Sequence, residues 1–233
     1  MNIALILSGG TGVRMGASLP KQYLEVNGRP MITFSLERLS LHKGIDAIQI
    51  TAEPEWQEQI EKWLVRYDPH KKWKGFSVPG ENRQLSIYHG LEDIRSYGED
   101  SDYVLIHDAA RPLLSEKLIT DCLEAVKGHD GVLPVLPMKD TVYASMDGKR
   151  ISSLLDRSQI FAGQAPEVFR LGKYYEANRR LLPEDILKIN GSTEPAILAG
   201  MDIAMVPGDE NNYKITTQAD LERFRASVGV SEE

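Results

Sequence analysis

Short apolar segments typical of buried strands alternate with segments of helical periodicity, and this alternation limits the possible folds more than any other feature of the chain. The strand-like segments are 3–7, 45–51, 76–78, 102–107 and 131–135. The helix-like segments between them are 31–41, 53–67, 80–94 and 118–126. Such alternation predicts an α/β fold with a mostly parallel sheet and helices on both faces. With 233 residues, 42% of them hydrophobic, the chain is long enough for one such domain spanning 1–233.

Residues 138–164 interrupt the alternation. Two β-like segments, 142–144 and 150–154, flank Met146-Asp147-Gly148-Lys149, which is typical of a hairpin turn. We interpret 138–164 as a β-arm that projects from the sheet and carries apolar side chains for a partner to cover. A homodimer is therefore expected; the alternative is a hairpin that folds back on its own domain.

After the arm, helices are expected at 171–181 and 194–199, and a strand at 202–206. A last helix should begin after Thr217, with Thr217 as its N-cap and Asp220 as a weaker version of the capping-box partner.

A glycine-rich loop follows the first strand. It reads Ser8-Gly9-Gly10-Thr11-Gly12-Val13-Arg14-Met15-Gly16, and Pro20-Lys21 comes soon afterwards. Glycines let backbone N–H groups surround a phosphate, and Arg14 and Lys21 add positive charge. The loop lacks the Gly-Lys-Ser/Thr of a P-loop, Gly16 comes one residue late for a dinucleotide fingerprint, and Pro20 interrupts the segment where a helix would begin. The loop therefore predicts a polyphosphate site, in preference to an ordinary strand-to-helix turn.

Further polar clusters follow other strands at the same predicted edge of the sheet. They are the segment with Arg83 and Ser86, the turn with Asp108 and Arg111, and Lys214 after the strand at 202–206. Because ligands of parallel sheets bind beyond the carboxyl ends of the strands, we expect these clusters to converge with the glycine loop. Asp108 is a candidate ligand for Mg²⁺ bound to phosphates, and the alternative is an Asp108–Arg111 ion pair that braces the turn.

Composition excludes several classes of protein. The formal net charge of −7 argues against general binding to nucleic acid or to an anionic membrane. Cys122 is the only cysteine, so no internal disulfide or cysteine-based zinc site is possible, and its apolar neighbours predict a buried structural thiol. His107 is expected to support the site from behind rather than act as a base. The charged leader of a signal peptide and any segment of membrane-spanning length are missing, so a soluble cytoplasmic protein is expected.

These residues suit a nucleotidyl transfer, in which an acceptor phosphate attacks the α-phosphorus of a nucleoside triphosphate and pyrophosphate leaves. Catalysis would consist of positioning and charge neutralisation, without a covalent intermediate. Arg14, Lys21 and Mg²⁺ would stabilise the charge on the transferring and leaving phosphates. Thr141 and Arg157 lie at the root of the arm and would enter the partner's site if the arm crosses to a second subunit.

The motifs together resemble a known family. In chain order they are L-S-G-G-T-G-V-R-M-G-x-x-x-P-K-Q, G-x-x-R-x-x-S, H-D-A-A-R-P, K-D-T, D-R and N-x-K-I-T-T-x-x-D-L. This set resembles the 2-C-methyl-D-erythritol 4-phosphate cytidylyltransferase family, whose motifs the sister ribitol-5-phosphate cytidylyltransferases share. The glycine loop alone occurs in many nucleotidyltransferases; the segments 107–112 and 212–221 make the resemblance specific. It implies a Rossmann-like single domain, a homodimer joined by β-arms, CTP as donor and Mg²⁺ as cofactor.

The resemblance also implies roles for individual residues. Those expected at the nucleotide are Gly9, Gly10 and Gly12 along the triphosphate, Arg14 and Lys21 at the transition state, and Arg83 and Ser86 facing the nucleotide. Those expected at the acceptor are Asp108 beside it and the metal, Lys214 and Arg111 in its phosphate pocket, and Thr141 and Arg157 reaching it from the neighbouring subunit.

Two segments depart from the family pattern: Ala165-Pro166-Glu167 replaces T-P-Q, and Thr193-Glu194-Pro195-Ala196 replaces T-D-[DE]-A. The departures leave the donor and the reaction type unchanged and bear on the acceptor. The first expected acceptor is 2-C-methyl-D-erythritol 4-phosphate, an isoprenoid precursor, and the second is ribitol-5-phosphate or another polyol phosphate used for surface polymers. Two other hypotheses are a sugar-1-phosphate nucleotidyltransferase that uses UTP or dTTP, and a catalytically weak nucleotide-binding paralogue.

Overall fold

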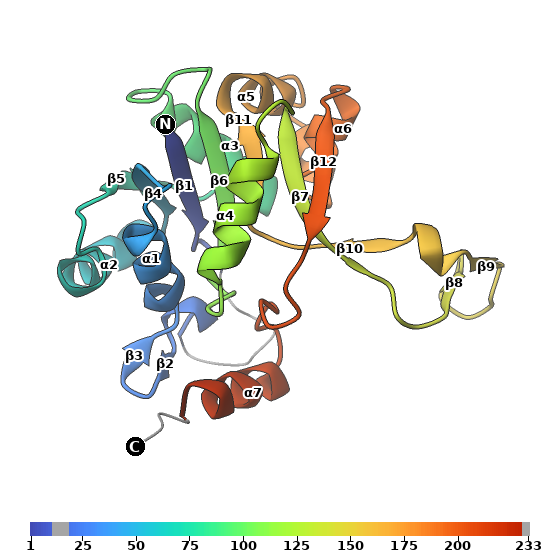
Figure 1. Ribbon diagram of the computed structural model, residues 1–233, viewed down its shortest axis with the longest axis horizontal. Helices are drawn as coiled ribbons and strands as arrows, with labels where there is room; N and C mark the ends of the chain where they lie inside the picture. The colour runs from blue at the N-terminus through green and yellow to red at the C-terminus, as the bar shows by residue number, and fades with distance from the viewer. Residues whose placement is uncertain (11–18, 230–233) are drawn as a thin grey trace.

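The computed structural model describes residues 1–10 and 19–229, and an eight-stranded sheet forms its centre (Figure 1). Six strands of this sheet run parallel to one another: β5 (Trp73–Ser77), β4 (Ala47–Thr51), β1 (Asn2–Leu7), β6 (Tyr103–Asp108), β7 (Gly131–Pro137) and β12 (Ile203–Pro207). Buried apolar residues fill both faces of the central strands, as in β1, where Ile3 to Ile6 are fully buried. The predicted mostly parallel sheet is confirmed.

Two antiparallel strands that the sequence did not predict complete the sheet. β11 (Glu167–Arg170) lies between β6 and β7, and β10 (Phe161–Gly163) pairs with the carboxyl half of β7. β10 and β11 have only three and four residues, which is too short for an alternating pattern to stand out. Since β10 belongs to the central sheet, the arm expected at 138–164 ends before Phe161.

Helices cover both faces of the sheet, as predicted. One face carries α1 (Ile32–Leu41), α2 (Pro54–Tyr67) and α4 (Glu116–Ala125), and the other carries α3 (Arg83–Ile94), α5 (Leu171–Arg179) and α6 (Glu194–Leu198). Cys122 on α4 is fully buried in the first of these layers, and burial raises the pKa of its thiol to about 12. The predicted burial of this thiol is confirmed.

A third, smaller apolar cluster lies beyond the carboxyl ends of the strands. There the 3₁₀ helix η2 (Lys21–Tyr23) leads into the hairpin of β2 (Glu25–Val26) and β3 (Arg29–Pro30), and α7 (Gln218–Gly229) lies nearby (Figure 1). The predicted capping box of α7 is confirmed: Asp220 N donates to Thr217 Oγ1 at 3.2 Å, and Thr217 N donates to Asp220 Oδ2 at 2.8 Å.

The arm projects from the sheet edge and ends in a small hairpin (Figure 1). β8 (Val142–Ala144) pairs with β9 (Ser153–Leu155), which places 145–152 in the connection, a longer one than the predicted four-residue turn. The side chain of Asp147 accepts hydrogen bonds from the backbone of Lys149 and Arg150 and so organises this connection. The 3₁₀ helix η3 (Arg157–Gln159) leads back to β10; another, η4 (Asp185–Lys188), follows α5.

The arm exposes large apolar side chains to solvent. The exposed fractions are 53% for Tyr143, 94% for Met146, 67% for Ile151 and 65% for Leu154. Among residues 1–10 and 19–229, no helix has the length and apolar character needed to cross a membrane.

Candidate active site

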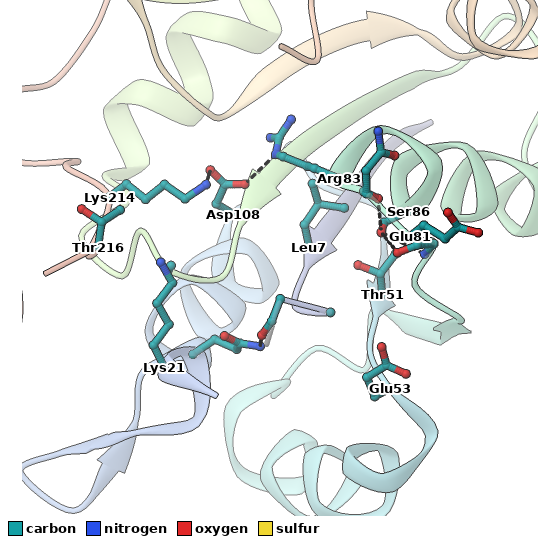
Figure 2. A pocket seen from close by; sticks show the side chains of 16 residues that line it. Leu7, Lys21, Thr51, Glu53, Glu81, Arg83, Ser86, Asp108, Lys214 and Thr216 are labelled. Carbon is teal, nitrogen blue, oxygen red and sulfur yellow. Dashed lines mark hydrogen bonds and ion pairs between the residues drawn. The ribbon is translucent and has the colours of Figure 1, made fainter. Parts of the chain in front are cut away.

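A cavity of about 500 Å³ opens at the carboxyl edge of the sheet, where β1, β4, β5 and β6 end (Figure 2). Its size suits a small-molecule ligand. The described residues that line it are Leu7, Gly9, Gly10, Lys21, Gln22, Thr51, Glu53, Gly80, Glu81, Asn82, Arg83, Ser86, Asp108, Ala110, Lys214 and Thr216. The structure therefore brings the separate polar clusters together at one edge of the sheet, as predicted.

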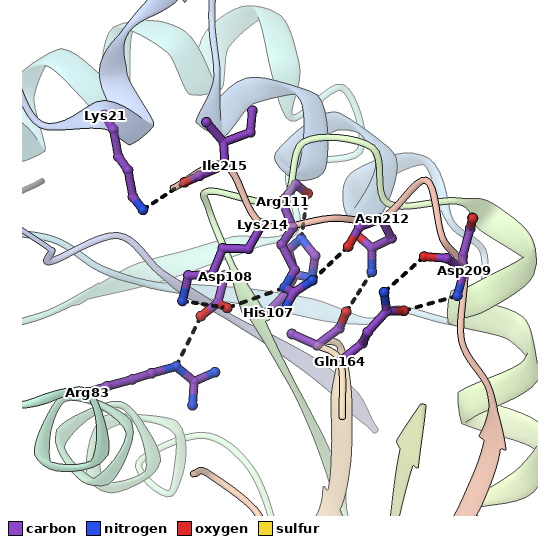
Figure 3. Close-up of polar contacts among 11 residues, drawn as sticks. Lys21, Arg83, His107, Asp108, Arg111, Gln164, Asp209, Asn212, Lys214 and Ile215 are labelled. Carbon is purple, nitrogen blue, oxygen red and sulfur yellow. Dashed lines mark hydrogen bonds and ion pairs between the residues drawn. The ribbon is translucent and has the colours of Figure 1, made fainter. Parts of the chain in front are cut away.

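Asp108, the last residue of β6, is the centre of charge in this cavity (Figures 2 and 3). Its Oδ1 lies 3.1 Å from Arg83 Nε, and its Oδ2 lies 3.0 Å from Lys214 Nζ and 3.5 Å from Arg111 Nε. Burial alone would raise the pKa of this carboxyl, but the three cations outweigh burial and hold the pKa far below its usual range. The charged form of Asp108 is therefore favoured. The Asp108–Arg111 ion pair, expected as an alternative to metal binding, is present together with the ion pairs to Arg83 and Lys214.

His107 lies behind the cavity, as expected. It is fully buried, and its Nε2 lies 3.0 Å from the Arg111 carbonyl oxygen. Burial lowers its pKa to about 4, so the ring is neutral at pH 7 and Nε2 donates the hydrogen bond. This bond supports the turn that carries Arg111.

The glycine loop contributes Gly9 and Gly10 to the cavity wall; Gly12 and Arg14 lie outside the described residues. Gly9 approaches Pro79 so closely that an added Cβ would lie 2.4 Å from the proline Cγ, which explains the need for glycine. Lys21 lines the same cavity, and its Nζ donates to the Ile215 carbonyl oxygen at 2.8 Å.

The N-terminus of α3 opens into the cavity through Arg83 and Ser86. Asn82 caps this helix by accepting a hydrogen bond from Leu85 N at 2.8 Å. The hydroxyl of Ser86 donates to the Asn82 carbonyl oxygen at 2.8 Å and accepts from Gly80 N at 3.0 Å. Ser86 therefore also orders the loop that carries the neighbouring lining residues.

The segment that carries Lys214 is held by hydrogen bonds to the residues that follow β10 (Figure 3). Gln164, which follows β10, exchanges two 3.0 Å hydrogen bonds with the backbone of Asp209. Asn212 Nδ2 donates to the Ala165 carbonyl oxygen at 2.6 Å. The residues that follow β10 therefore help to position the segment that carries Lys214.

Some lining residues were not among the predicted site residues; they include Gln22, Thr51, Glu53, Glu81 and Thr216. Glu53 and Glu81 lie on the side of Thr51 and Ser86, whereas Lys21 and Lys214 lie on the opposite side (Figure 2). The cavity therefore has a cationic end and an acidic end. Gln22 was visible in the P-K-Q motif, but nothing in the sequence distinguished Glu53 from the other acids that begin a helix.

Three predicted acceptor residues do not line this cavity. Arg111 lies beside Asp108, and its Nη1 donates to the Asn212 carbonyl oxygen at 2.7 Å. Thr141 and Arg157 belong to the arm, where Arg157 Nη1 donates to the Lys139 carbonyl oxygen at 2.9 Å. Their roles at an acceptor stay predictions.

Glu167, which stands where the family pattern has Gln, lies at the same sheet edge, at the start of β11. Its carboxyl is buried and accepts a 3.4 Å hydrogen bond from Thr193 Oγ1. Burial raises its pKa, and the charge of Arg83 acts in the opposite direction. The buried side chain of Ala165, close by in sequence, offers no hydroxyl at this edge.

Asp108 is the carboxylate with which a divalent cation could interact in this cluster. In the described part of the chain, no three His, Cys, Asp or Glu groups are close enough to hold a metal by themselves. Each Asp108 oxygen already accepts from a cation but has further lone pairs. The donor set therefore fits Mg²⁺ when phosphate oxygens and water supply the other ligands.

Comparisons with known proteins agree with this geometry. Residues 2–229 match the family described as 2-C-methyl-D-erythritol 4-phosphate cytidylyltransferase. A ribitol-5-phosphate cytidylyltransferase of Vibrio parahaemolyticus is 32% identical over 234 residues, covering 100% of this chain and 98% of that protein. A bifunctional enzyme IspD/IspF of Granulibacter bethesdensis is 35% identical over 231 residues, or 98% of this chain and 56% of that longer protein. The crystal structure of 4-diphosphocytidyl-2C-methyl-D-erythritol synthase from Anaerococcus prevotii superposes with a TM-score of 0.84 at 26% identity, over 98% of this chain and 96% of that one.

The sheet, the edge cavity and these relatives define a CTP-dependent nucleotidyltransferase. More particularly, the chain belongs to the 2-C-methyl-D-erythritol 4-phosphate cytidylyltransferase family, and it is also similar to proteins named ribitol-5-phosphate cytidylyltransferase.

Proposed function

We propose that this protein transfers CMP from CTP to a polyol phosphate and releases pyrophosphate. The observation that carries the proposal is the meeting of Gly9, Gly10, Lys21, Asp108 and Lys214 around one cavity. The charge distribution orients the nucleotide: the cationic end suits the triphosphate, and the acidic end with Glu53 and Glu81 disfavours it. The nucleoside would then lie toward Ser86 and the start of α3.

The chain's own residues would act by positioning and by neutralising charge. Backbone N–H groups of Gly9 and Gly10 and the ammonium of Lys21 would hold the leaving phosphates. Lys214 would direct the acceptor phosphate toward the α-phosphorus while Asp108 fixes the ammonium of Lys214. Arg14, predicted to share the charge of the transition state, lies outside the described residues.

We propose Mg²⁺ as the cofactor, with Asp108 as its protein ligand. The ion would supply charge neutralisation between the phosphates. The ion pairs of Asp108 with Arg83 and Lys214 would keep its carboxylate oriented toward the cavity.

We further propose a homodimer joined by the arms. The exposed apolar side chains of the hairpin support this assembly, because such a cluster of apolar surface favours a partner. Thr141 and Arg157 would then reach the acceptor phosphate in the partner subunit. Use of CTP supports a cytoplasmic location, and the net charge of −7 supports small-molecule partners rather than nucleic acid.

Two acceptors have support. The family match over 2–229 favours 2-C-methyl-D-erythritol 4-phosphate as the first candidate. The full-length relatives named ribitol-5-phosphate cytidylyltransferase favour ribitol-5-phosphate as the second.

The decisive experiment measures pyrophosphate release with each of the four nucleoside triphosphates against both polyol phosphates and a panel of sugar 1-phosphates. CTP-dependent turnover with one polyol phosphate at a much higher kcat/KM supports the proposal and identifies the acceptor. Turnover with UTP or dTTP and a sugar 1-phosphate would replace it, and nucleotide binding without turnover on any acceptor would indicate a catalytically weak paralogue.

A further inference from the structure

Gln22 is buried beside the glycine loop, and the proposed reaction leaves it without a role. Its side chain is 3% exposed. Its Nε2 donates to the Ser8 carbonyl oxygen at 2.5 Å and to the Gly10 carbonyl oxygen at 2.7 Å. One amide group thus uses both of its N–H bonds on the backbone of the loop.

The bond to Ser8 fixes which way the Ser8–Gly9 peptide faces. In a trans peptide, the C=O and N–H groups point in opposite directions. Holding the Ser8 carbonyl toward Gln22 therefore turns the N–H of Gly9 away from Gln22. Within the part of the chain that the structure describes, the N–H groups of Gly9 and Gly10 donate to no other group, and both residues line the cavity.

Tyr23 strengthens the same arrangement. Its hydroxyl donates to the Ser8 carbonyl oxygen at 3.1 Å and lies 2.6 Å from Ser8 Oγ, so both lone pairs of that carbonyl are used. The ring of Tyr23 stacks on Trp56 of α2 with centroids 4.4 Å apart. Because Lys21, Gln22 and Tyr23 form one 3₁₀ turn, the bonds also tie the position of Lys21 to that of the loop.

We propose that Gln22 is a positioning residue for nucleotidyl transfer. Its amide holds the Ser8 and Gly10 carbonyl oxygens, so that Gly9 presents its N–H group rather than the Ser8 carbonyl oxygen to the polyphosphate. Carbonyl oxygens would repel the phosphates and N–H groups attract them, so the orientation decides whether the loop binds an anion. The inference rests on the proposed function for its place in the reaction, but it concerns polyphosphate binding and can be tested separately.

The test compares Gln22→Met with Gln49→Met. Methionine keeps the length of the side chain and removes the donors. Gln49 is an equally buried glutamine, 2% exposed, that bonds with Ser77 and Tyr97 away from the loop, so its variant controls for the loss of buried hydrogen bonds. The readouts are the affinity for inorganic pyrophosphate with Mg²⁺ by calorimetry, the KM values for CTP and acceptor, and the thermal midpoint.

Gln22→Met is expected to weaken pyrophosphate binding by about tenfold, from two lost hydrogen bonds, and to raise the KM for CTP while leaving that for the acceptor unchanged. Gln49→Met should bind pyrophosphate as the parent does. Equal pyrophosphate affinity in Gln22→Met and the parent would overturn the inference. If Gln22→Met fails to fold, Tyr23→Phe removes the second donor to Ser8 and keeps the stacked ring; it should weaken pyrophosphate binding a few-fold, and unchanged affinity would overturn the inference equally.

The outcome separates the two proposals. A parent protein that binds pyrophosphate but turns over no CTP with any polyol phosphate would refute the proposed function, and the comparison of variants would still decide the role of Gln22. A parent that binds no pyrophosphate would contradict both.

Discussion

At the scale of single residues, the ionisation of Asp108 shows how burial and charge compete. Its carboxyl is buried, yet Arg83, Lys214 and Arg111 keep it charged. A buried anion of this kind is stable only with its partners in place, because an unpaired buried charge is strongly unfavourable. The same contacts hold Arg83 and Lys214 at the wall of the cavity.

Lys21→Ala is expected to lower kcat by roughly 100- to 1,000-fold, the usual cost of removing a group that stabilises charge in a transition state. Steady-state pyrophosphate release measures the effect, and circular dichroism checks the fold. Lys62→Ala, which removes an exposed α2 lysine paired with Glu58 at 2.8 Å, is the control and should keep the parent rate. A near-normal rate for Lys21→Ala would remove this lysine from the mechanism.

Residue types at strand ends were enough to predict that Lys21, Asp108 and Lys214 meet. Parallel strands bring their carboxyl ends to one edge whatever the loops between them do, so position in the chain determined position in space. The acids Glu53 and Glu81 could not be predicted in the same way. Their place depends on how α2 and the loop before α3 pack, and an acid at the start of a helix is common for reasons unrelated to ligands.

At the scale of elements, the cap of α7 links stability to the cavity. Asp220 Oδ2 accepts hydrogen bonds from Thr216 N at 2.9 Å, Thr216 Oγ1 at 3.0 Å and Thr217 N at 2.8 Å, and Thr216 lines the cavity. Burial raises the pKa of this carboxyl, but the hydrogen bonds outweigh burial and lower the pKa to about 2. The cap therefore stabilises the folded protein where Asp220 is ionised.

Asp220→Asn should lower the free energy of unfolding by about 1 kcal/mol at pH 7, as loss of a cap usually does. Because the pKa is depressed in the folded state, the stabilisation is complete above the ordinary aspartate pKa of about 4 and is lost as the pH falls through about 2. Urea unfolding of parent and variant between pH 7 and pH 2 tests this. Glu222→Gln on the exposed face of α7 is the control, and a difference for Asp220→Asn that does not change with pH would contradict the assignment.

Arg157→Ala tests the arm as a substrate-binding element. It should raise the KM for the polyol phosphate by about tenfold or more, because a charge-assisted bond to phosphate contributes more than a neutral one, and leave the KM for CTP unchanged. Arg150→Ala, in the exposed connection of the same hairpin, is the matched control. A change confined to the KM for CTP would show that Arg157 serves the nucleotide instead.

The hairpin and the capping box were predictable because both are local, and the turn and cap residues lie within a few positions of one another. β10 and β11 were not, because their place in the sheet depends on β6 and β7, tens of residues away. A strand of three or four residues has no sequence pattern that would show whether it runs parallel or antiparallel to its neighbours.

At the scale of the whole molecule, the proposed dimer predicts that subunits carrying different substitutions can complement each other, which single variants cannot test. If Arg157 serves the partner's site, a mixed dimer of Lys21→Ala and Arg157→Ala subunits contains one complete site. Refolding the two impaired variants together in equal amounts, and assaying with the acceptor far below its KM, should then give about a quarter of the parent activity, since half of the dimers are mixed and each has one working site. No recovery, with mixed dimers shown by mass spectrometry, would place Arg157 in the site of its own subunit.

The hydrogen bonds between Gln164 and Asp209, and between Asn212 and Ala165, have a practical consequence. A compound that binds at the hairpin and displaces β10 would also displace the segment that carries Lys214. Screening for inhibitors by turnover would therefore detect molecules that never touch the nucleotide pocket, and competition with CTP would be a poor criterion for discarding them.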